Sequence, residues 1–254
     1  MSCCYRLLRG RACSLSLVLC FTADGTTVRA ADWYTGQEKP NETWIVAVNS
    51  SVTVTSIGSQ FADLNATVAV DGKPDESGFR VRLDGLGGVY RYRDQATGLH
   101  IHGQEEEGSL LGGYQWIGQS FRIAGFVGPD LRNDSVSIPD PHNPVVGTSV
   151  GAKAVLDGWF KPLDRVMISG YGSYTTNDNA YFTRLKAGYA VLDEIYIGPE
   201  TSLLGNDFFN QWRIGGHLSG LQLGPLQFAL AGGYLHDRMQ KGGAYSTLDI
   251  RSGF

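Results

Sequence analysis

His217 and Ser219 are the residues whose types and spacing come closest to a catalytic pair. They lie two positions apart, with Asn210 nearby. A serine that is activated by a histidine, itself oriented by a third polar group, performs acyl transfer in many hydrolases. Both residues fall on the polar parity of an alternating segment, however, and a lipid substrate would meet the opposite, apolar face. We therefore expect no catalytic residue here, and an enzyme stays the alternative.

Three consecutive carboxylates, Glu105, Glu106 and Glu107, are a second candidate site. Glycoside cleavage needs two carboxyl groups about 5–9.5 Å apart on either side of a sugar bond. Consecutive residues of a strand point to opposite faces, so these three cannot all share one face. We interpret part of the run as a solvated rim or a bulge.

A third group combines histidines and aspartates that could bind a divalent cation. Its members follow no strict ligand spacing, so we expect neither a metal site nor a cofactor. They are His100, His102, Asp130, Asp134 and His142.

Many charged residues fall on one parity of alternating segments. Facing inward in a barrel, they could line a pore or a sugar-contacting lumen, or they could simply neutralise one another. A charge on the lipid face would cost roughly 2–4 kcal/mol at the membrane midplane, so inward charges need no function to explain them. We favour an ion-pair network that fills a narrow barrel. The residues are Arg80, Arg82, Asp84, Arg122, Lys153, Asp157, Arg184, Lys186, Glu200, Arg213, Asp249 and Arg251.

The elements that position these side chains are strands, because apolar and polar residues alternate with a period of two. Between Tyr181 and Phe254 five such segments of roughly 10–12 residues are separated by tight turns, and the segment ends on an aromatic residue. This is typical of an all-β, antiparallel transmembrane β-barrel with its apolar face outward. A periplasmic β-sandwich or a lipocalin-like barrel is the soluble alternative.

The whole chain divides into twelve expected strands, with ten as the alternative count. We expect a bulge near Gly87–Gly88, the end of the fifth strand at Val127, and a long irregular connection over Pro129–Pro144. Connections after even-numbered strands are mostly tight and those after odd-numbered strands longer, which matches the short periplasmic turns and long outer loops of bacterial barrels.

Residues 1–30 read as a signal peptide. Arg6, Arg9 and Arg11 precede an apolar stretch too short to span a membrane, and a small-residue site ends at Ala30. We expect residues 31–254 to form a single barrel domain. All four cysteines lie in the leader, so the remaining chain has no thiol chemistry. It keeps 17 basic and 24 acidic residues, which excludes the basic footprint of a nucleic-acid-binding protein.

Four short motifs occur in an order and spacing that resemble a known family. They are Asp32–Gly36, Glu76–Arg82, Gly113–Trp116, and Gly198–Glu200 followed by Leu204–Asn206. Together they resemble the BcsS cellulose-biosynthesis family of alphaproteobacteria, over essentially all of the chain after the leader.

The resemblance implies a barrel of the Gram-negative outer membrane that takes part in making cellulose, and it carries no catalytic residues with it. We expect a non-enzymatic protein that assists cellulose export or surface anchoring. Its expected partners are outer-membrane lipid and cellulose or the cellulose-export machinery, without nucleic acid. The alternatives are a passive pore for small solutes and an outer-membrane enzyme that modifies lipid or polysaccharide.

Overall fold

The computed structural model describes residues 45–94, 97–192, 194–239 and 241–254. The expected signal peptide and the motif Asp32–Gly36 lie outside these residues. Among the described residues no helix has the length and hydrophobicity that a helical membrane span needs. Apart from one short 3-10 turn, η1 (Asn177–Asn179), the elements of this part of the chain are strands.

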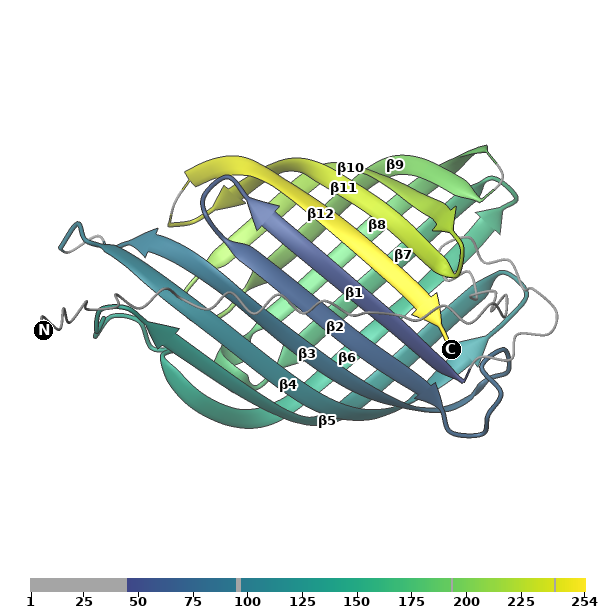
Figure 1. Ribbon diagram of the computed structural model, residues 1–254, viewed down its shortest axis with the longest axis horizontal. Coiled ribbons are helices and arrows are strands. Elements are labelled where there is room, and N and C mark those ends of the chain that lie inside the picture. Colours follow the sequence, from purple (N-terminus) through teal and green to yellow (C-terminus); the bar gives the residue numbers. More distant parts are fainter. Residues whose placement is uncertain (1–44, 95–96, 193, 240) are drawn as a thin grey trace, which may run out of the picture.

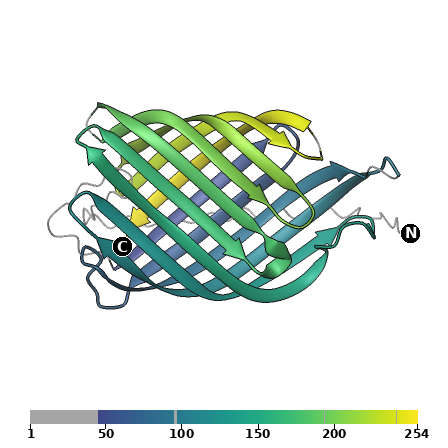
Figure 2. The same ribbon diagram turned by 180° about the vertical axis from the view of Figure 1, so that it is seen from behind.

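Twelve antiparallel strands form a closed barrel, in which β12 pairs with β1 (Figures 1 and 2). The prediction of twelve strands is confirmed and the alternative of ten is wrong. Each strand pairs with its sequence neighbours, so every connection is a simple hairpin. The strands are β1 (Val46–Thr55), β2 (Gln60–Ala69), β3 (Gly78–Arg93), β4 (His100–Ile117), β5 (Phe121–Val136), β6 (Gly147–Leu163), β7 (Val166–Thr175), β8 (Tyr181–Leu192), β9 (Ile195–Gly205), β10 (Asn210–Leu223), β11 (Leu226–Asp237) and β12 (Lys241–Gly253).

The outer face of the barrel is apolar and the inner face is polar, the reverse of a water-soluble barrel. Leucine, valine and isoleucine side chains on the outward parity, such as Leu83, Leu156 and Leu185, are more than half exposed. A strand of twelve residues rises about 30 Å when tilted by about 40°, which is enough to cross an apolar band of about 25 Å. The alternation therefore has the polarity and length of a membrane-spanning wall.

Exposed aromatic residues gather near both ends of the outer face. Trp116 and Phe160 lie close to the connections that follow even-numbered strands, and Tyr174, Trp212 and Tyr234 lie towards the opposite end. Two aromatic girdles on either side of an apolar band are typical of outer-membrane barrels, because amphipathic rings favour the lipid–water interface.

The two ends of the barrel differ. Four of the five connections after even-numbered strands are tight turns; the exception runs over residues 70–77. The carboxy terminus lies at this end, on the right in Figure 1. At the other end the hairpins from β3 to β6 extend beyond the rest of the barrel (Figures 1 and 2). We call these the short-turn end and the long-loop end.

Two sequence-based expectations about strand geometry are wrong. The fifth strand does not end at Val127 but continues to Val136, so half of the Pro129–Pro144 stretch is paired sheet. The pairing of β5 with β4 lapses at Pro129, which has no N–H to donate, and continues in the same register on both sides of it. The expected bulge at Gly87–Gly88 is also absent, since β3 pairs with both neighbours there without a register shift.

One of the two glycines, Gly88, has another reason than a bulge. A Cβ atom on Gly88 would lie 2.1 Å from the ring of Phe61. The missing side chain thus leaves space inside the barrel for that ring. Bulges do occur elsewhere, and one lies at Gly220 between Ser219 and Leu221, where φ is +87°. Such a positive φ favours glycine over other residues.

Candidate functional site: the barrel lumen

A cluster of charged side chains bridges β3 to β6 inside the barrel. Arg82 donates to Asp84 and to Asp157, the latter at 2.6 Å. Lys153 pairs with Glu107 and lies 3.6 Å from Asp84. Since β3 and β6 are not neighbouring strands, these contacts leave the wall and cross part of the lumen. We call the group the β3–β6 charge cluster; it consists of Arg82, Asp84, Glu105, Glu107, Arg132, Lys153 and Asp157.

A second cluster bridges β8 to β12. Arg184 and Lys186 both pair with Asp249 at 2.9 Å, and both also pair with Glu200. Tyr245 donates its hydroxyl hydrogen to Glu200 at 3.2 Å. β8 and β12 are not neighbouring strands, so this β8–β12 charge cluster also crosses part of the lumen. Its two cations and two carboxylates balance one another.

The other four predicted inward residues lie on the same face. Arg80 donates to Gln115 at 2.8 Å and to main-chain carbonyls of the 70–77 connection, which it ties to the barrel wall. Arg213 donates to Gln211 and lies over the ring of Tyr245. Arg122 and Arg251 are buried on the inner face. All twelve predicted residues thus face inward, and eight of them form ion pairs within the two clusters.

Sequence reasoning missed several inward charges that the structure adds. Arg132 of β5 pairs with Glu105 at 2.8 Å and lies 3.8 Å from Glu107, whereas Glu106 points outward. The run of three glutamates therefore alternates within a regular strand. Asp63 of β2 also faces inward. The signal that could have found them was the alternation itself, which continues through both stretches.

Burial raises the pKa of the Asp178 carboxyl in the connection after β7 above its usual range, and Arg132 opposes this rise. The distance between Arg132 Nε and the Asp178 carboxylate is 4.0 Å. The loop is thus drawn towards the β3–β6 charge cluster. Asn177 of the same turn donates to Asp130 at 2.9 Å, which anchors η1 on the inner wall.

A cavity of about 380 Å³ lies in the lumen beside both clusters. Its lining includes residues of the connections after β1, β5, β7, β9 and β11, among them Val145 and Phe208. None of the described connections after even-numbered strands contributes to it. The cavity therefore faces the long-loop end. A volume of this size is typical of a ligand pocket.

The connection after β5 folds back over the mouth of this cavity. Tyr92 of β3 donates to Asp140 at 2.7 Å and accepts from Asn143 at 3.3 Å. Asn143 and Val145 are almost completely buried, although they belong to a loop. These contacts hold the loop in one conformation, so the mouth of the cavity has a defined shape.

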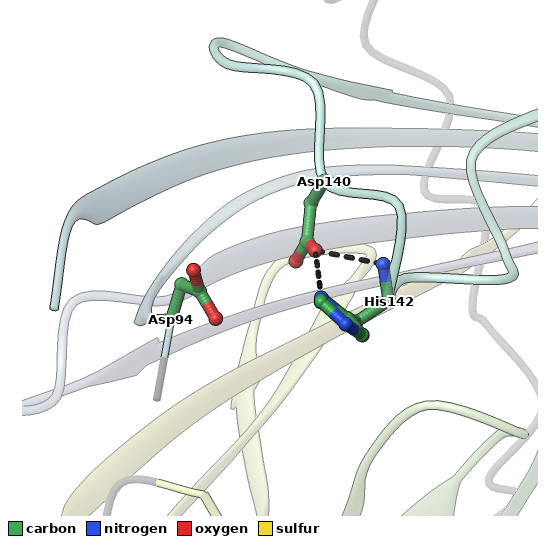
Figure 3. Close-up of side chains that lie close together, drawn as sticks. All are labelled: Asp94, Asp140 and His142. Atoms are coloured by element: carbon green, nitrogen blue, oxygen red, sulfur yellow. Dashed lines mark hydrogen bonds and ion pairs between the residues drawn. The ribbon is translucent and has the colours of Figure 1, made fainter. Parts of the chain in front are cut away.

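Three residues of the connections after β3 and β5 come together in a way that could hold a cation. Asp94, Asp140 and His142 offer ligand atoms within 4.8 Å of one another (Figure 3). Asp140 already accepts from Tyr92 and from the backbone of His142, and Asp94 accepts from Thr97. Both carboxylates therefore help to hold the conformation of these loops.

The cation group considered from the sequence does not assemble. His100 and His102 point outward from β4, whereas Asp130 and Asp134 are buried inside. Asp130 accepts from Ser109 and Thr175, each at 2.7 Å. His142 lies in the separate loop group just described.

The His217–Ser219 pair exists as a hydrogen bond but is sealed from the cavity. Ser219 Oγ lies 2.8 Å from His217 Nδ1, and His217 Nε2 lies 3.2 Å from the carbonyl oxygen of Ala187. His217 therefore donates through Nε2 and accepts the serine hydroxyl. Both side chains are buried, and neither lines the cavity.

A Gly-x-Ser-x-Gly string over residues 147–151 escaped the sequence reasoning. Nucleophilic serines of this pattern lie on a sharp turn between a strand and a helix. Ser149 instead lies within β6, paired with Arg132 of β5. The pattern here is a stretch of strand, so it forms no nucleophile elbow.

With the geometry established, comparison with known proteins assigns the family. The family model "Cellulose biosynthesis protein BcsS" matches residues 59–254. The chain belongs to this family. The BcsS match covers the barrel from the start of β2 to the last residue, and the family resemblance seen in the sequence motifs is thereby confirmed. The protein is thus a barrel linked to cellulose biosynthesis.

Comparison with solved structures supports the fold of this BcsS-family chain. The transport unit of the autotransporter AIDA-I from Escherichia coli is similar with a TM-score of 0.51 and 8% identity, over 85% of this chain and 92% of that one. The translocator domain of the autotransporter NalP from Neisseria meningitidis gives 0.46 and 10%, over 83% and 88%. The KdgM porin gives 0.44 and 11%, over 82% and 99%.

At these identities the likeness concerns the fold alone. The barrel of this chain resembles those of Gram-negative outer-membrane proteins. Comparison with the curated proteins finds no match.

Proposed function

We propose that this protein is a non-catalytic barrel of the outer membrane that holds cellulose at the cell surface. In this role the barrel retains the polymer on the outside and does not conduct it through its lumen. Family membership supplies the link to cellulose biosynthesis. The single observation that favours retention is the pair of charge clusters that cross the lumen.

Membrane insertion is supported by the outer face. The side chains of Val150, Leu156 and Leu185 would each lose water contact in lipid, and burial of such side chains contributes about 1.5–3 kcal/mol each. Both chain ends of the closed sheet lie at the short-turn end. In bacterial barrels that end faces the periplasm, so the cavity would open to the outside.

Retention is supported over conduction by what occupies the lumen. A polymer in transit would have to displace the contacts of Arg82 with Asp157 and of Lys186 with Asp249, which are 75 and 63 residues apart in sequence. Removing one partner of a buried ion pair costs about 3–5 kcal/mol, which sets the scale for separating the two charges. A chain sliding through would meet this barrier at both clusters, whereas a chain held at the mouth would meet neither.

The absence of catalysis is part of the proposal and has its own support. Ser219 has no exposed surface, so its hydroxyl group could not attack a polymer in the cavity. In a strain lacking the gene, copies with Ser219→Ala or His217→Gln should restore cellulose retention as well as the unchanged gene does. Loss of retention by either folded variant would favour the enzyme alternative.

Deletion of the gene tests retention directly. Total cellulose should stay nearly constant, while the fraction attached to cells falls and the fraction in the medium rises. Polymer that accumulates in the periplasm would instead indicate an export role and contradict the proposal. No change in either fraction would remove the link to surface attachment.

The passive-pore alternative is tested on the purified protein in planar lipid bilayers. Because both clusters bridge the lumen, we expect no steady single-channel conductance. A stable conductance of the unchanged protein would show that the lumen is open and would favour the pore.

A further inference from the structure

We propose that the lumen cavity is a binding site for the end of a neutral, linear β-glucan, with Asp63 and Phe208 as its principal contacts. That the sugar is a glucan rests on the proposed function, whereas the preference for a neutral sugar follows from the site. The assignment rests on one unpartnered carboxylate, a wall of uncharged polar side chains and an aromatic mouth.

Asp63 differs from the other carboxylates of the cavity. It lines the cavity from β2 and forms no hydrogen bond, and no ion pair within 4.0 Å, with any described residue. Asp157 and Asp249, by contrast, are held by the cations of the two clusters. A carboxyl group offers two oxygen atoms to hydrogen-bond donors, and where it is ionised such bonds are about twice as strong as neutral ones. Sugar hydroxyl groups are donors that would suit it.

The wall beside Asp63 carries amides and hydroxyls in place of charges. Asn49 donates to Asn65 at 2.9 Å, and Thr53 shares a hydrogen bond with Thr247 at 2.9 Å. All four line the cavity. Such groups both donate and accept, so they can meet hydroxyl groups in either sense. A sugar would therefore find a polar wall on this side that its own hydroxyls can satisfy.

The mouth of the cavity is aromatic. The ring of Phe208 lies 5.1 Å from the ring of Tyr92, at 70°. Asn206 accepts from the backbone N–H groups of Phe208 and Phe209, which fixes this loop. Phe208 is partly exposed and lines the cavity. The negative ring face attracts the weakly positive C–H groups on the flat side of a pyranose.

The charge of the lining selects among sugars. It contains nine carboxylates, from Asp63 to Asp249, and seven basic side chains. The lining therefore carries no excess of positive charge that would attract an acidic polysaccharide such as a polyuronate. The closed wall, in which every strand is paired on both sides, gives a lipid no lateral entry. A neutral sugar chain entering from the long-loop end is the ligand that fits.

Calorimetric titration of the refolded protein in detergent with cellohexaose tests the site. Cellohexaose should bind, and hexagalacturonate should bind at least tenfold more weakly. Asp63→Asn and Phe208→Ala should each weaken cellohexaose binding about tenfold or more. Asp164→Asn, in a tight turn at the other end, and Phe79→Ala, on the outer face, are matched controls that should bind as the unchanged protein does. Heat-modifiable migration in electrophoresis checks that each variant is folded.

The outcomes separate this inference from the proposed function. Absent cellohexaose binding, tighter binding of hexagalacturonate, or equal affinity of all four folded variants would overturn the site. If the deletion strain nevertheless loses surface cellulose, the proposed function stands without this site. If cellohexaose binds as expected while deletion leaves cellulose attached, the site stands and the retention role fails.

Discussion

Replacing Arg82 by methionine should destabilise the barrel more than any exposed arginine replacement, because it leaves two carboxylates without their partner. Arg82 contacts Asp84 and Asp157, and all three side chains are less than one-tenth exposed. Methionine keeps the length and packing of the aliphatic stem but removes the charge. The variant thus isolates the electrostatic contribution of the β3–β6 charge cluster.

The magnitude follows from the two ion pairs. At a charge separation of about 4 Å and an effective dielectric constant of about 20, each pair contributes about 4 kcal/mol of attraction. The desolvation of the guanidinium group offsets several kcal/mol of this. Measured losses for breaking buried pairs are about 3–5 kcal/mol, and we expect Arg82→Met to lie in that range. Lys153, which also lies 3.6 Å from Asp84, keeps the loss from being larger.

Urea unfolding of the refolded protein in detergent, followed by tryptophan fluorescence, measures the loss. Arg165→Met, in the exposed turn after β6, is the control and should change the free energy of unfolding by less than about 0.5 kcal/mol. Adding Asp157→Asn to Arg82→Met should restore part of the stability, since it removes one uncompensated charge. An Arg82→Met effect within about 1 kcal/mol of the control, or strict additivity of the double variant, would refute the reasoning.

Two further predictions concern the wall. Leu185→Arg, in the middle of the outer face of β8, should lower the free energy of unfolding in lipid vesicles by about 2–4 kcal/mol. Leu223→Arg, beside a turn, should lower it by at most about 1 kcal/mol. Urea titrations measure both effects, and equal effects would contradict a lipid-facing wall. Gly198→Ala should lower the free energy of unfolding by about 1–3 kcal/mol, because the new Cβ atom would lie 1.9 Å from the carbonyl oxygen of Ala187. Gly216→Ala, whose Cβ atom would lie 3.5 Å from its nearest neighbour, should leave it nearly unchanged in the same titration.

The fold could be predicted because a lipid-exposed wall forces one simple rule on the sequence. Alternate residues must be apolar, so strand number and inward parity follow from inspection. The rule failed where a residue carries no parity information. Gly87 and Gly88 have no side chain to show a face, and Pro129 resembles a loop residue although it lies within β5. Beyond Pro129, however, Asp130 and Arg132 continue the inward parity and could have revealed the longer strand.

The contents of the lumen could be predicted only in part. Parity says that Arg82 and Asp157 face inward, but it does not say that they meet. That depends on strand tilt and stagger, which bring residues of non-adjacent strands to one level once the sheet closes. The Asp94–Asp140–His142 group was missed for a related reason, since its members come from two different connections. Contacts across a closed barrel are a property of the closure.

The pairing pattern inside the lumen is uneven, and this unevenness carries more information than the number of charges. If the inner wall needed only mutual neutralisation, each carboxylate at the level of the clusters would be expected to have a cation. Asp84, Asp157, Glu200 and Asp249 do. Asp63 has no such cation, although one basic residue on β1 or elsewhere on β2 would be enough to pair with it. An unpaired carboxylate beside a polar wall is costly to maintain in a desolvated place, and it becomes tolerable where water or a hydroxylated ligand reaches it. The cavity supplies that access, which ties the exception to the surface where we place the sugar.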